Sequence, residues 1–432
     1  MDILSENKFY WSYQETPTLL LGASDTDNLF QWTGKKLKAH LDEIISVGGN
    51  YVRNTMSSRG EDCVYPFKKN SEGLFDLNEW NQEYWKRLEN FLEETSKRDI
   101  IVQIEVWDCW DTGISPFGEG DHWDTSPYNP KNNINYSKEE SGLPKSWEYH
   151  PMNRNHPFYL ATPNLNNEKT VYQHQEKFVK KLLSITTEYQ NVLYTICNET
   201  RLPEDFSIFW ARFIKENTEN SGKVFISEME SDPNVKPVKN HPKLFDFAEV
   251  AQIGEFHQTR HYEKLREMRK SIECQPAPLN IDKQYGSDEK PGRIHSTEEE
   301  VKRKMWRAIF AGCASFRFHR PGYGIGLNSS SKKMIKSVRK AQEKFNIFEA
   351  EPDNSIIARK RVDQAYALKG KDQNLIYFTD GGEIRLHPEK SYSAVKWLDI
   401  ENAEWKENLR EIKEDKLNAP DNQSQWLALL KE

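Results

Sequence analysis

The sequence has no hydrophobic run long enough to cross a membrane. Its longest apolar stretches, such as residues 18–23, have the length of a β-strand, whereas a membrane helix needs about 20 apolar residues. The first residues also lack the basic region and apolar segment that define a signal peptide. We therefore expect no membrane partner. The location stays open between a secreted or periplasmic chain whose signal peptide has been removed and a cytoplasmic chain.

A basic charge excess and the common metal motifs are absent as well. The 67 acidic and 60 basic residues give a net charge of -7, whereas nucleic-acid-binding proteins usually carry a basic surface. The five cysteines include no CxxC pair, and the histidines show neither an HxH nor an HExxH pattern. We therefore expect no nucleic-acid partner, no metal, no cofactor and no disulfide framework, with the thiols free and mostly buried. The oligomeric state stays open.

Aromatic residues are plentiful, and apolar segments alternate with segments of helical periodicity. Aromatic residues make up 12% of the chain, which is too many for a disordered protein. Eight short apolar segments predict strands at residues 18–24, 51–56, 100–106, 192–196, 224–226, 250–253, 278–281 and 313–316. Strands that alternate with helices predict an α/β fold, specifically a (β/α)8 TIM barrel. A doubly wound sheet is disfavoured because no GxGxxG motif follows the first strand.

The sequence pattern of the chain changes after about residue 351. Short strand-like segments predict a small antiparallel, β-sandwich-like domain over residues 352–432, after a catalytic barrel over residues 1–351. Thr379-Asp-Gly-Gly382 predicts a hairpin turn within it. Within the barrel, Ser296 and Glu299 predict a capping box at the start of a helix.

The predicted site residues lie where the predicted strands end, because barrel active sites form at the carboxyl ends of the strands. In chain order they are Arg53, Glu105, Trp107, Asp108, Asn198, Glu199, Glu228, Glu255, His257, Asp282, Lys283, Tyr285, Arg317 and His319. A rim of solvated charges without function is the alternative. The unusually long loop at residues 108–173 is rich in Trp and Tyr, and loops of this length are usually functional. We expect it to shape a binding cleft; the alternative is that it packs against the barrel alone.

The dipeptide Asn198-Glu199, with Arg53 on the second predicted strand, resembles the signature of a known enzyme clan. This clan contains the retaining glycoside hydrolases with (β/α)8 barrels, and the resemblance covers about residues 10–350. It implies that Glu199 protonates the leaving oxygen and that Asn198 binds the neighbouring sugar hydroxyl of a polysaccharide or oligosaccharide. The C-terminal β-domain is similar to the small β-modules often appended to such barrels.

The second carboxylate of the predicted catalytic pair stays open. In the clan that Asn198-Glu199 resembles, the nucleophile is a Glu at the end of the seventh strand. At the end of its seventh predicted strand, this sequence has Asp282 and Lys283. Glu255 follows the sixth predicted strand, one strand earlier than the nucleophile of the clan, and Glu228, after the fifth predicted strand, is the third choice. Glycoside hydrolysis needs two carboxyl groups, about 5–5.5 Å apart for retention and about 6.5–9.5 Å apart for inversion. The resemblance favours retention. The distance between the two carboxyl groups, which decides the outcome, is not given by the sequence.

A basic cluster follows the eighth predicted strand. Arg317, His319 and Arg320 predict contacts with an anionic substrate, such as a sulfated or uronic-acid-bearing glycan. The alternative is that Arg317 pairs with a neighbouring acid and shifts its pKa. Two rival functions remain: a catalytically inactive carbohydrate-binding barrel and a polysaccharide lyase that uses His or Tyr.

Overall fold

The computed structural model forms two compact units that interleave along the sequence. It describes all residues except 61, 114–121, 153, 290–295, 389–391, 393, 407–411, 413–414 and 432. Unit 1 comprises Met1, Thr26–Asp42 and Val52–Gln252, and unit 2 comprises Asp2–Asp25, Glu43–Tyr51 and Ile253–Glu432. Among the described residues, every helix is too short or too polar to traverse a lipid bilayer.

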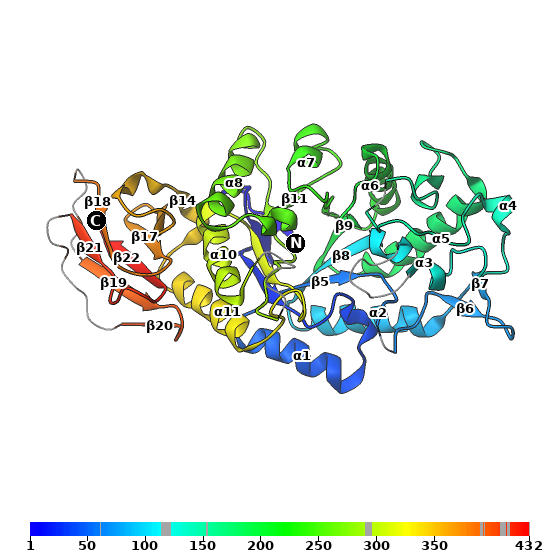
Figure 1. Cartoon of the computed structure of the whole chain (residues 1–432), viewed down its shortest axis with the longest axis horizontal. Coiled ribbons are helices and arrows are strands. Elements are labelled where there is room, and N and C mark those ends of the chain that lie inside the picture. Colours follow the sequence, from blue (N-terminus) through cyan, green and yellow to red (C-terminus); the bar gives the residue numbers. More distant parts are fainter. Residues whose placement is uncertain are drawn as a thin grey trace. The chain divides into compact units, whose positions relative to one another are not determined.

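Unit 1 is built around a four-stranded sheet with the order β10-β9-β8-β5, of which β9, β8 and β5 are labelled in Figure 1. The strands are β5 (Tyr51–Thr55), β8 (Ile101–Asp108), β9 (Val192–Asn198) and β10 (Ile226–Ser227). β9 runs parallel to β8 and to β10. Every residue of β5, β8 and β9 is buried, as expected for parallel strands covered on both faces. The parallel register places Asp108 opposite Asn198 where both strands end.

Helices and short strands complete unit 1. The helices are α1 (Gly34–Ser46), which continues into unit 2, α2 (Gln82–Ser96), α5 (Lys169–Thr186), α6 (Glu204–Thr218) and α7 (Lys236–Asn240). An antiparallel pair forms from β6 (Phe67–Lys69) and β7 (Phe75–Trp80). The apolar faces of α2, α5 and α6 are buried, so each helix covers hydrophobic surface as an amphipathic helix does.

Unit 2 contains the parallel pair β4 (Leu20–Ala23) and β13 (Ser315–Phe318), both fully buried. Gly22 in β4 is required, because a Cβ atom there would lie 1.8 Å from the Tyr51 carbonyl oxygen. The helices are α8 (Gln258–Ser271), α10 (Glu298–Ala311) and α11 (Ser329–Gln342). The remaining short strands of this part are β1 (Asp2–Ile3), β2 (Trp11–Tyr13), β3 (Thr16–Thr18) and β12 (Leu279–Asn280).

Seven of the eight predicted barrel strands are present, and the sixth is wrong. The predicted strand at residues 250–253 lies mostly in the 3-10 helix η4 (Ala251–Glu255), directly after β11 (Ala248–Glu249). The Glu249 carboxylate accepts a hydrogen bond from the Ala251 amide at 2.9 Å, which turns the chain out of the extended conformation. A four-residue apolar run is too short for its periodicity to distinguish a strand from a buried turn of helix.

The predicted capping box at Ser296 and Glu299 is wrong, because the residue that caps α10 is the next one, Thr297. Thr297 caps α10, and its hydroxyl accepts a hydrogen bond from the Glu300 amide at 3.2 Å. Thr297 has the same spacing to Glu300 that Ser296 has to Glu299, so the motif fits the sequence equally well in either register. The cap therefore shows that boundaries from short motifs are accurate to about one residue.

From Glu351 onward, apart from the 3-10 helix η6 (Asn354–Ile356), the regular elements are strands. A six-stranded sheet has the order β14-β16-β17-β22-β19-β20, and a three-stranded sheet has the order β15-β18-β21. Their bounds are β14 (Glu351–Pro352), β15 (Ile357–Arg359), β16 (Ala365–Lys369), β17 (Gln373–Phe378), β18 (Glu383–Leu386), β19 (Ala394–Asp399), β20 (Glu404–Trp405), β21 (Lys416–Asn418) and β22 (Trp426–Lys431). Side chains from both sheets share one hydrophobic cluster. The division of the chain at residue 351 stays a prediction.

The predicted hairpin at Thr379-Asp-Gly-Gly382 is wrong. β17 pairs with β16 and β22, whereas β18 pairs with β15 and β21, so the turn connects two different sheets. Gly381 and Gly382 both have positive φ angles, of 68° and 84°, and this conformation is what the Gly-Gly pair signals. The same pair also permits close packing, because a Cβ atom on Gly381 would lie 2.1 Å from the Asp421 carbonyl oxygen.

The long loop at residues 108–173 contains short helices and a buried histidine. The helices are η2 (Cys109–Thr112), α3 (His122–Thr125), α4 (Lys138–Ser141) and η3 (Tyr159–Ala161). His156 lies between Trp123 and Trp147, with both ring-centroid distances at 4.5 Å. Its Nδ1 accepts a hydrogen bond from the Phe158 amide at 3.3 Å. Burial lowers the pKa of His156 from 6.5 to about 3, so the folded protein holds this imidazole in its neutral form.

We predict that His156 makes the loop sensitive to acid. Below pH 6.5 the unfolded chain binds a proton at this residue and the folded chain does not, so stability falls as pH decreases toward 3. The difference of pKa between the two states corresponds to a loss of about 2 kcal/mol at pH 5 relative to pH 7. His156→Asn retains an acceptor for the Phe158 amide and does not titrate near these pH values. Urea unfolding at both pH values should show a smaller pH dependence in the variant; equal pH dependence would contradict this role.

Candidate active site

Glu199 directly follows β9 and is almost completely buried, with 5% of its surface exposed. Its carboxylate accepts one hydrogen bond on each oxygen, from Trp110 Nε1 at 2.8 Å and from Gln252 Nε2 at 3.1 Å. Its φ angle is +51°, in the left-handed region that non-glycine residues rarely adopt. Such backbone strain persists only where the surroundings enforce it, and it is concentrated at functional sites. The structure thus fixes both the backbone and the carboxylate of Glu199.

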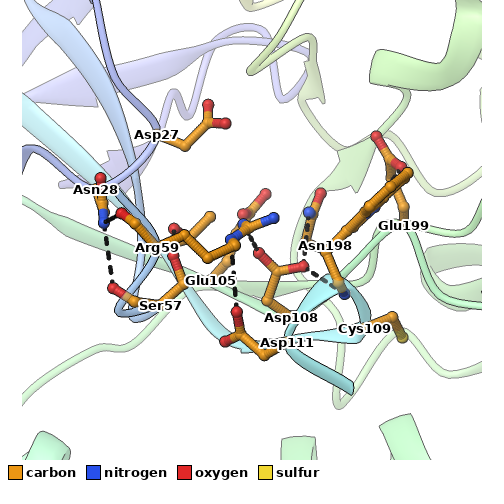
Figure 2. Close-up of polar contacts among 12 residues, drawn as sticks. Asp27, Asn28, Ser57, Arg59, Glu105, Asp108, Cys109, Asp111, Asn198 and Glu199 are labelled. Carbon is orange, nitrogen blue, oxygen red and sulfur yellow. Dashed lines mark hydrogen bonds and ion pairs between the residues drawn. The ribbon is translucent and has the colours of Figure 1, made fainter. Parts of the chain in front are cut away.

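Asp108, the last residue of β8, accepts a hydrogen bond from Asn198, the residue before Glu199 (Figure 2). Asp108 Oδ1 accepts hydrogen bonds from Asn198 Nδ2 and from the Trp110 amide, both at 3.0 Å. Its Oδ2 is paired with the Arg59 guanidinium. The same Asp108 therefore orients the Asn198 amide and fixes the start of the 3-10 helix that carries Trp110.

Arg59 lies between two aspartates. Besides Asp108, its Nε is 3.4 Å from Asp111 Oδ1. Burial and the nearby Asp108 carboxylate raise the pKa of Asp111 to about 7, and the Arg59 charge opposes this shift. Asp108 and Asp111 thus share the single positive charge of Arg59. If both were ionised, two negative charges would face one positive charge.

The predicted residues Arg53 and Glu105 form a buried ion pair. Arg53 donates to both Glu105 oxygens, from Nε at 2.7 Å and from Nη2 at 2.6 Å, and its Nη1 donates to Asp27 Oδ1 at 2.6 Å. Arg53 is 1% exposed and Glu105 is 0% exposed. Each carboxylate is thus held by a charged donor, which is the condition for an ionised group to be tolerated in a protein interior.

Glu228 follows β10 and is buried, and among the described residues neither of its carboxylate oxygens has a partner at ordinary hydrogen-bond geometry. Burial raises its pKa well above the usual range, and the neighbouring Ser207 hydroxyl opposes this only in part. A raised pKa favours the protonated form of this carboxyl group. This makes Glu228 a poor candidate for a nucleophile, because attack requires the ionised form.

Trp107 packs within the hydrophobic interior of unit 1. Its ring contacts Phe158, Phe178 and Trp210 at centroid distances of 5.2–5.7 Å. It also lines a cavity of about 90 Å³. The loop aromatic that reaches the candidate acid is Trp110 instead.

In unit 2, the two remaining catalytic candidates have opposite surroundings. Glu255, at the end of η4, is exposed. Asp282 is 0% exposed. His257, near Glu255, is 3.9 Å from a carboxylate oxygen of Glu300. The buried setting of Asp282 restricts its motion as a nucleophile requires, whereas an exposed side chain has many rotamers.

The basic cluster is mostly buried. Arg317 is 0% exposed, its Nη1 donates to the Asp282 carbonyl at 2.9 Å, and its Nη2 contacts the Ser24 hydroxyl. Arg317 therefore holds the backbone at Asp282, which is a structural function that the sequence pattern does not reveal.

The other members of this cluster lie around two tyrosine rings. His319 contacts the ring of Tyr285 at 4.9 Å, and Lys283 Nζ lies 5.8 Å from the same ring. The half-buried Arg320 lies 4.5 Å from the Tyr323 ring.

The residues that the structure describes include no group of three or more His, Cys, Asp or Glu side chains placed to hold a metal ion.

Sequence comparisons assign no activity to the chain. A family model described as a domain of unknown function, DUF6298, matches residues 67–262. This range contains most of the candidate residues of unit 1, including Glu105, Asp108, Asn198 and Glu199. No curated protein matches the chain in sequence.

Solved structures show what fold the chain has. A glycoside hydrolase family 5 structure from Bacteroides vulgatus is similar with a TM-score of 0.67 and 15% identity, over 100% of this chain and 93% of that chain. A family 5 mannosidase from Rhizomucor miehei gives a TM-score of 0.55 and 13% identity, over 80% of this chain and 98% of that chain. A maltogenic α-amylase from Thermotoga neapolitana gives 0.54 and 9%, over 96% and 99%. The chain has the α/β fold of these glycoside hydrolase structures.

Several contacts of the site involve residues outside the predicted set. The residues that contact predicted residues directly are Trp110, Gln252, Arg59 and Asp27, and Asp111 in turn contacts Arg59. Trp110 is three residues beyond Trp107, so the sequence indicates an aromatic residue near the end of this strand. It does not indicate which of the two tryptophans contacts Glu199. Gln252 lies in the segment mistaken for a strand, and no motif marks it.

Proposed function

We propose that the protein is a glycoside hydrolase that cleaves a polysaccharide or oligosaccharide with two carboxyl groups. The observation that carries the proposal is the setting of Glu199: it follows Asn198 at the end of β9, is buried, and has a left-handed backbone conformation. The shared fold with glycoside hydrolase structures supports it. A carbohydrate is then the substrate, and no cofactor takes part.

In this proposal Glu199 is the general acid, which becomes the general base in a retaining mechanism. Trp110 and Gln252 each donate a hydrogen bond to one oxygen of the Glu199 side chain and so fix the orientation of its carboxyl group. Asp108 orients the Asn198 amide, which binds the sugar hydroxyl next to the reacting carbon. A carboxylate positioned in this way contributes about 10²–10⁴-fold to the rate.

The second carboxylate is proposed to be Asp282 or Glu255. The burial of Asp282 and its backbone contact with Arg317 support Asp282. The exposure of Glu255 suits a residue that binds substrate rather than one that attacks it. Retention or inversion depends on which of the two acts.

We predict that Asp282→Asn and Glu255→Gln have unequal effects on the proposed reaction. The substitution of the nucleophile should leave almost no turnover, because the covalent or water-activating step then lacks an ionised carboxylate. The other substitution should mainly raise KM. Steady-state kinetics of both purified variants checks this, with circular dichroism as the control for folding. If both variants keep wild-type activity, neither residue is the second carboxylate.

The function is tested by mass spectrometry of oligosaccharide digests. Incubation with a panel of plant, algal and animal glycans should yield products that carry one added water per cleavage. Products with an unsaturated end and ultraviolet absorbance would show a polysaccharide lyase. Binding to a glycan array without any cleavage would show an inactive carbohydrate-binding protein. The same digests, analysed for anomeric configuration by NMR, distinguish retention from inversion.

An anionic substrate, sulfated or uronic-acid-bearing, is a further part of the proposal that rests on the charges of unit 2. The buried Arg317 gives it little support, because its described contacts are with the protein itself. The half-buried Arg320 and the buried His319 are the groups whose place after β13 still favours it. Binding of matched sulfated and desulfated oligosaccharides at low and high salt decides the question, since salt weakens contacts between exposed charges.

A further inference from the structure

Two thiols meet between the ends of β8 and β9. The sulfur atoms of Cys109 and Cys197 are 3.3 Å apart, although the residues are 88 positions apart in the sequence. Cys109 follows the last residue of β8 and begins η2, and Cys197 is the penultimate residue of β9. Both are buried, with 1% and 0% of their surface exposed. Cys63 lies instead against the Asn28 side chain and the Arg59 carbonyl, and Cys274 is exposed.

The geometry needs little change to join the two sulfurs. A disulfide has a bond length of about 2.0 Å, so closing the gap requires each sulfur to move by about 0.6 Å. In the parallel pairing of β8 with β9, Cys197 lies opposite Trp107 and Asn198 lies opposite Asp108, so Cys109 follows directly after the last paired residue of β8. The direct approach of the two sulfur atoms, at 3.3 Å, is what places the thiols within reach of a bond.

We propose that Cys109 and Cys197 are a redox pair that forms a disulfide when the chain folds in an oxidising compartment. Both S–H bonds break, one S–S bond forms, and two protons and two electrons leave the pair. The electrons pass to a disulfide of a thiol oxidoreductase or to oxidised glutathione, which is reduced to two thiols. This inference goes beyond the proposed function and does not depend on it.

The burial of the pair determines when the reaction occurs. Thiol–disulfide exchange needs a thiolate and access to an incoming sulfur. In the folded protein, burial and the neighbouring Cys109 raise the pKa of the Cys197 thiol well above its usual range. Exchange is therefore fast only before the strand ends are packed, or when they open transiently. Once formed, the bond is shielded from reductants for the same reason.

The disulfide would also stiffen the candidate site. Cys109 lies between Asp108, which orients Asn198, and Trp110, which donates to Glu199. Cys197 directly precedes Asn198. A covalent bond between these positions would fix the ends of the two strands relative to each other. It would also close a long loop, which stabilises a protein mainly by restricting its unfolded state.

The test compares protein folded under oxidising and reducing conditions. One sample is secreted to a bacterial periplasm and one is made in the reducing cytosol with dithiothreitol throughout. After unfolding with a maleimide present, the oxidised sample should have two fewer alkylated thiols, and without alkylation its mass should be lower by about 2 Da, the mass of two hydrogen atoms. A non-reducing peptide map should contain the cross-linked Cys109 and Cys197 peptides. The melting temperature should be higher than that of the reduced sample by roughly 5 °C.

Matched variants make the result specific. Cys197→Ser and Cys109→Ser should each abolish the mass difference and the gain in melting temperature. Cys274→Ser removes an exposed thiol and should leave both unchanged. Five alkylatable cysteines in the periplasmic sample would overturn the proposal, as would a cross-link that joins other cysteines. The proposal would also be overturned if the oxidised sample lost two alkylatable thiols but its non-reducing peptide map lacked the cross-linked Cys109–Cys197 peptide.

Discussion

Replacing Glu199 by Gln should reduce kcat/KM for a natural oligosaccharide by about 10²–10⁴-fold, the contribution of a positioned acid. The substitution retains the size of the side chain and an acceptor oxygen for one of its two hydrogen bonds, from Trp110 and Gln252. The fold should therefore persist. What is lost is the proton that the leaving oxygen needs when the glycosidic bond breaks.

The dependence on the leaving group separates chemistry from structure. An aryl glycoside with an acidic phenol needs little protonation, so Glu199→Gln should lose much less activity on it in the bond-breaking step than on a natural substrate. A variant that is merely misfolded would lose both activities equally. Glu216→Gln makes the same change at an exposed position of α6 and serves as the control. Near wild-type kcat on an unactivated substrate would contradict the assignment.

The hydrogen bond from Trp110 offers a milder test of the same geometry. Trp110→Phe removes the Nε1 donor at 2.8 Å from Glu199 and leaves an aromatic ring in its place. A neutral hydrogen bond contributes about 0.5–1.5 kcal/mol, so kcat should fall by roughly two- to tenfold with KM little changed. An unchanged kcat would mean that Gln252 alone positions the carboxylate.

The sequence predicts the strands better than it predicts what their ends contact. Long buried strands such as β8 and β9 are clear from their apolar runs, because every residue in them is buried. The α/β class and seven of the eight predicted strands follow from this pattern. The segment at residues 250–253 was misread because its four apolar residues fit a strand and a 3-10 helix equally well.

The partners of the site residues depend on distant pairings, which no local pattern contains. Asn198 and Glu199 stand out as a motif, but their contacts Asp108 and Trp110 come from the end of β8 and from the 3-10 helix η2 that follows it, about 90 residues earlier. Arg317 shows the converse: its position after a strand suggested a substrate contact, whereas its guanidinium holds the Asp282 backbone. Charge in a sequence predicts a counter-charge or a ligand, and only the fold distinguishes them.

Arg53 is expected to produce the largest change in stability of any residue at the site. Its guanidinium is the charged donor that holds the buried Glu105 carboxylate, and it also binds Asp27. Arg53→Met removes this cation and leaves a fully buried carboxylate without its counter-ion. Breaking a buried pair in this way typically costs about 3–5 kcal/mol, because the remaining charge is uncompensated.

The expected result for Arg53→Met is therefore a free energy of unfolding lower by about 3–5 kcal/mol, measured by urea denaturation followed by tryptophan fluorescence. The double variant Arg53→Met/Glu105→Gln should recover part of that loss, because the neutral amide has no unpaired charge and the two residues are energetically coupled. Arg212→Met removes an exposed arginine from α6 and should change stability by less than about 0.5 kcal/mol. If Arg53 instead served mainly to bind substrate, its substitution would raise KM and leave the unfolding curve in place. A stable Arg53→Met protein would thus reassign the guanidinium from the protein interior to the ligand.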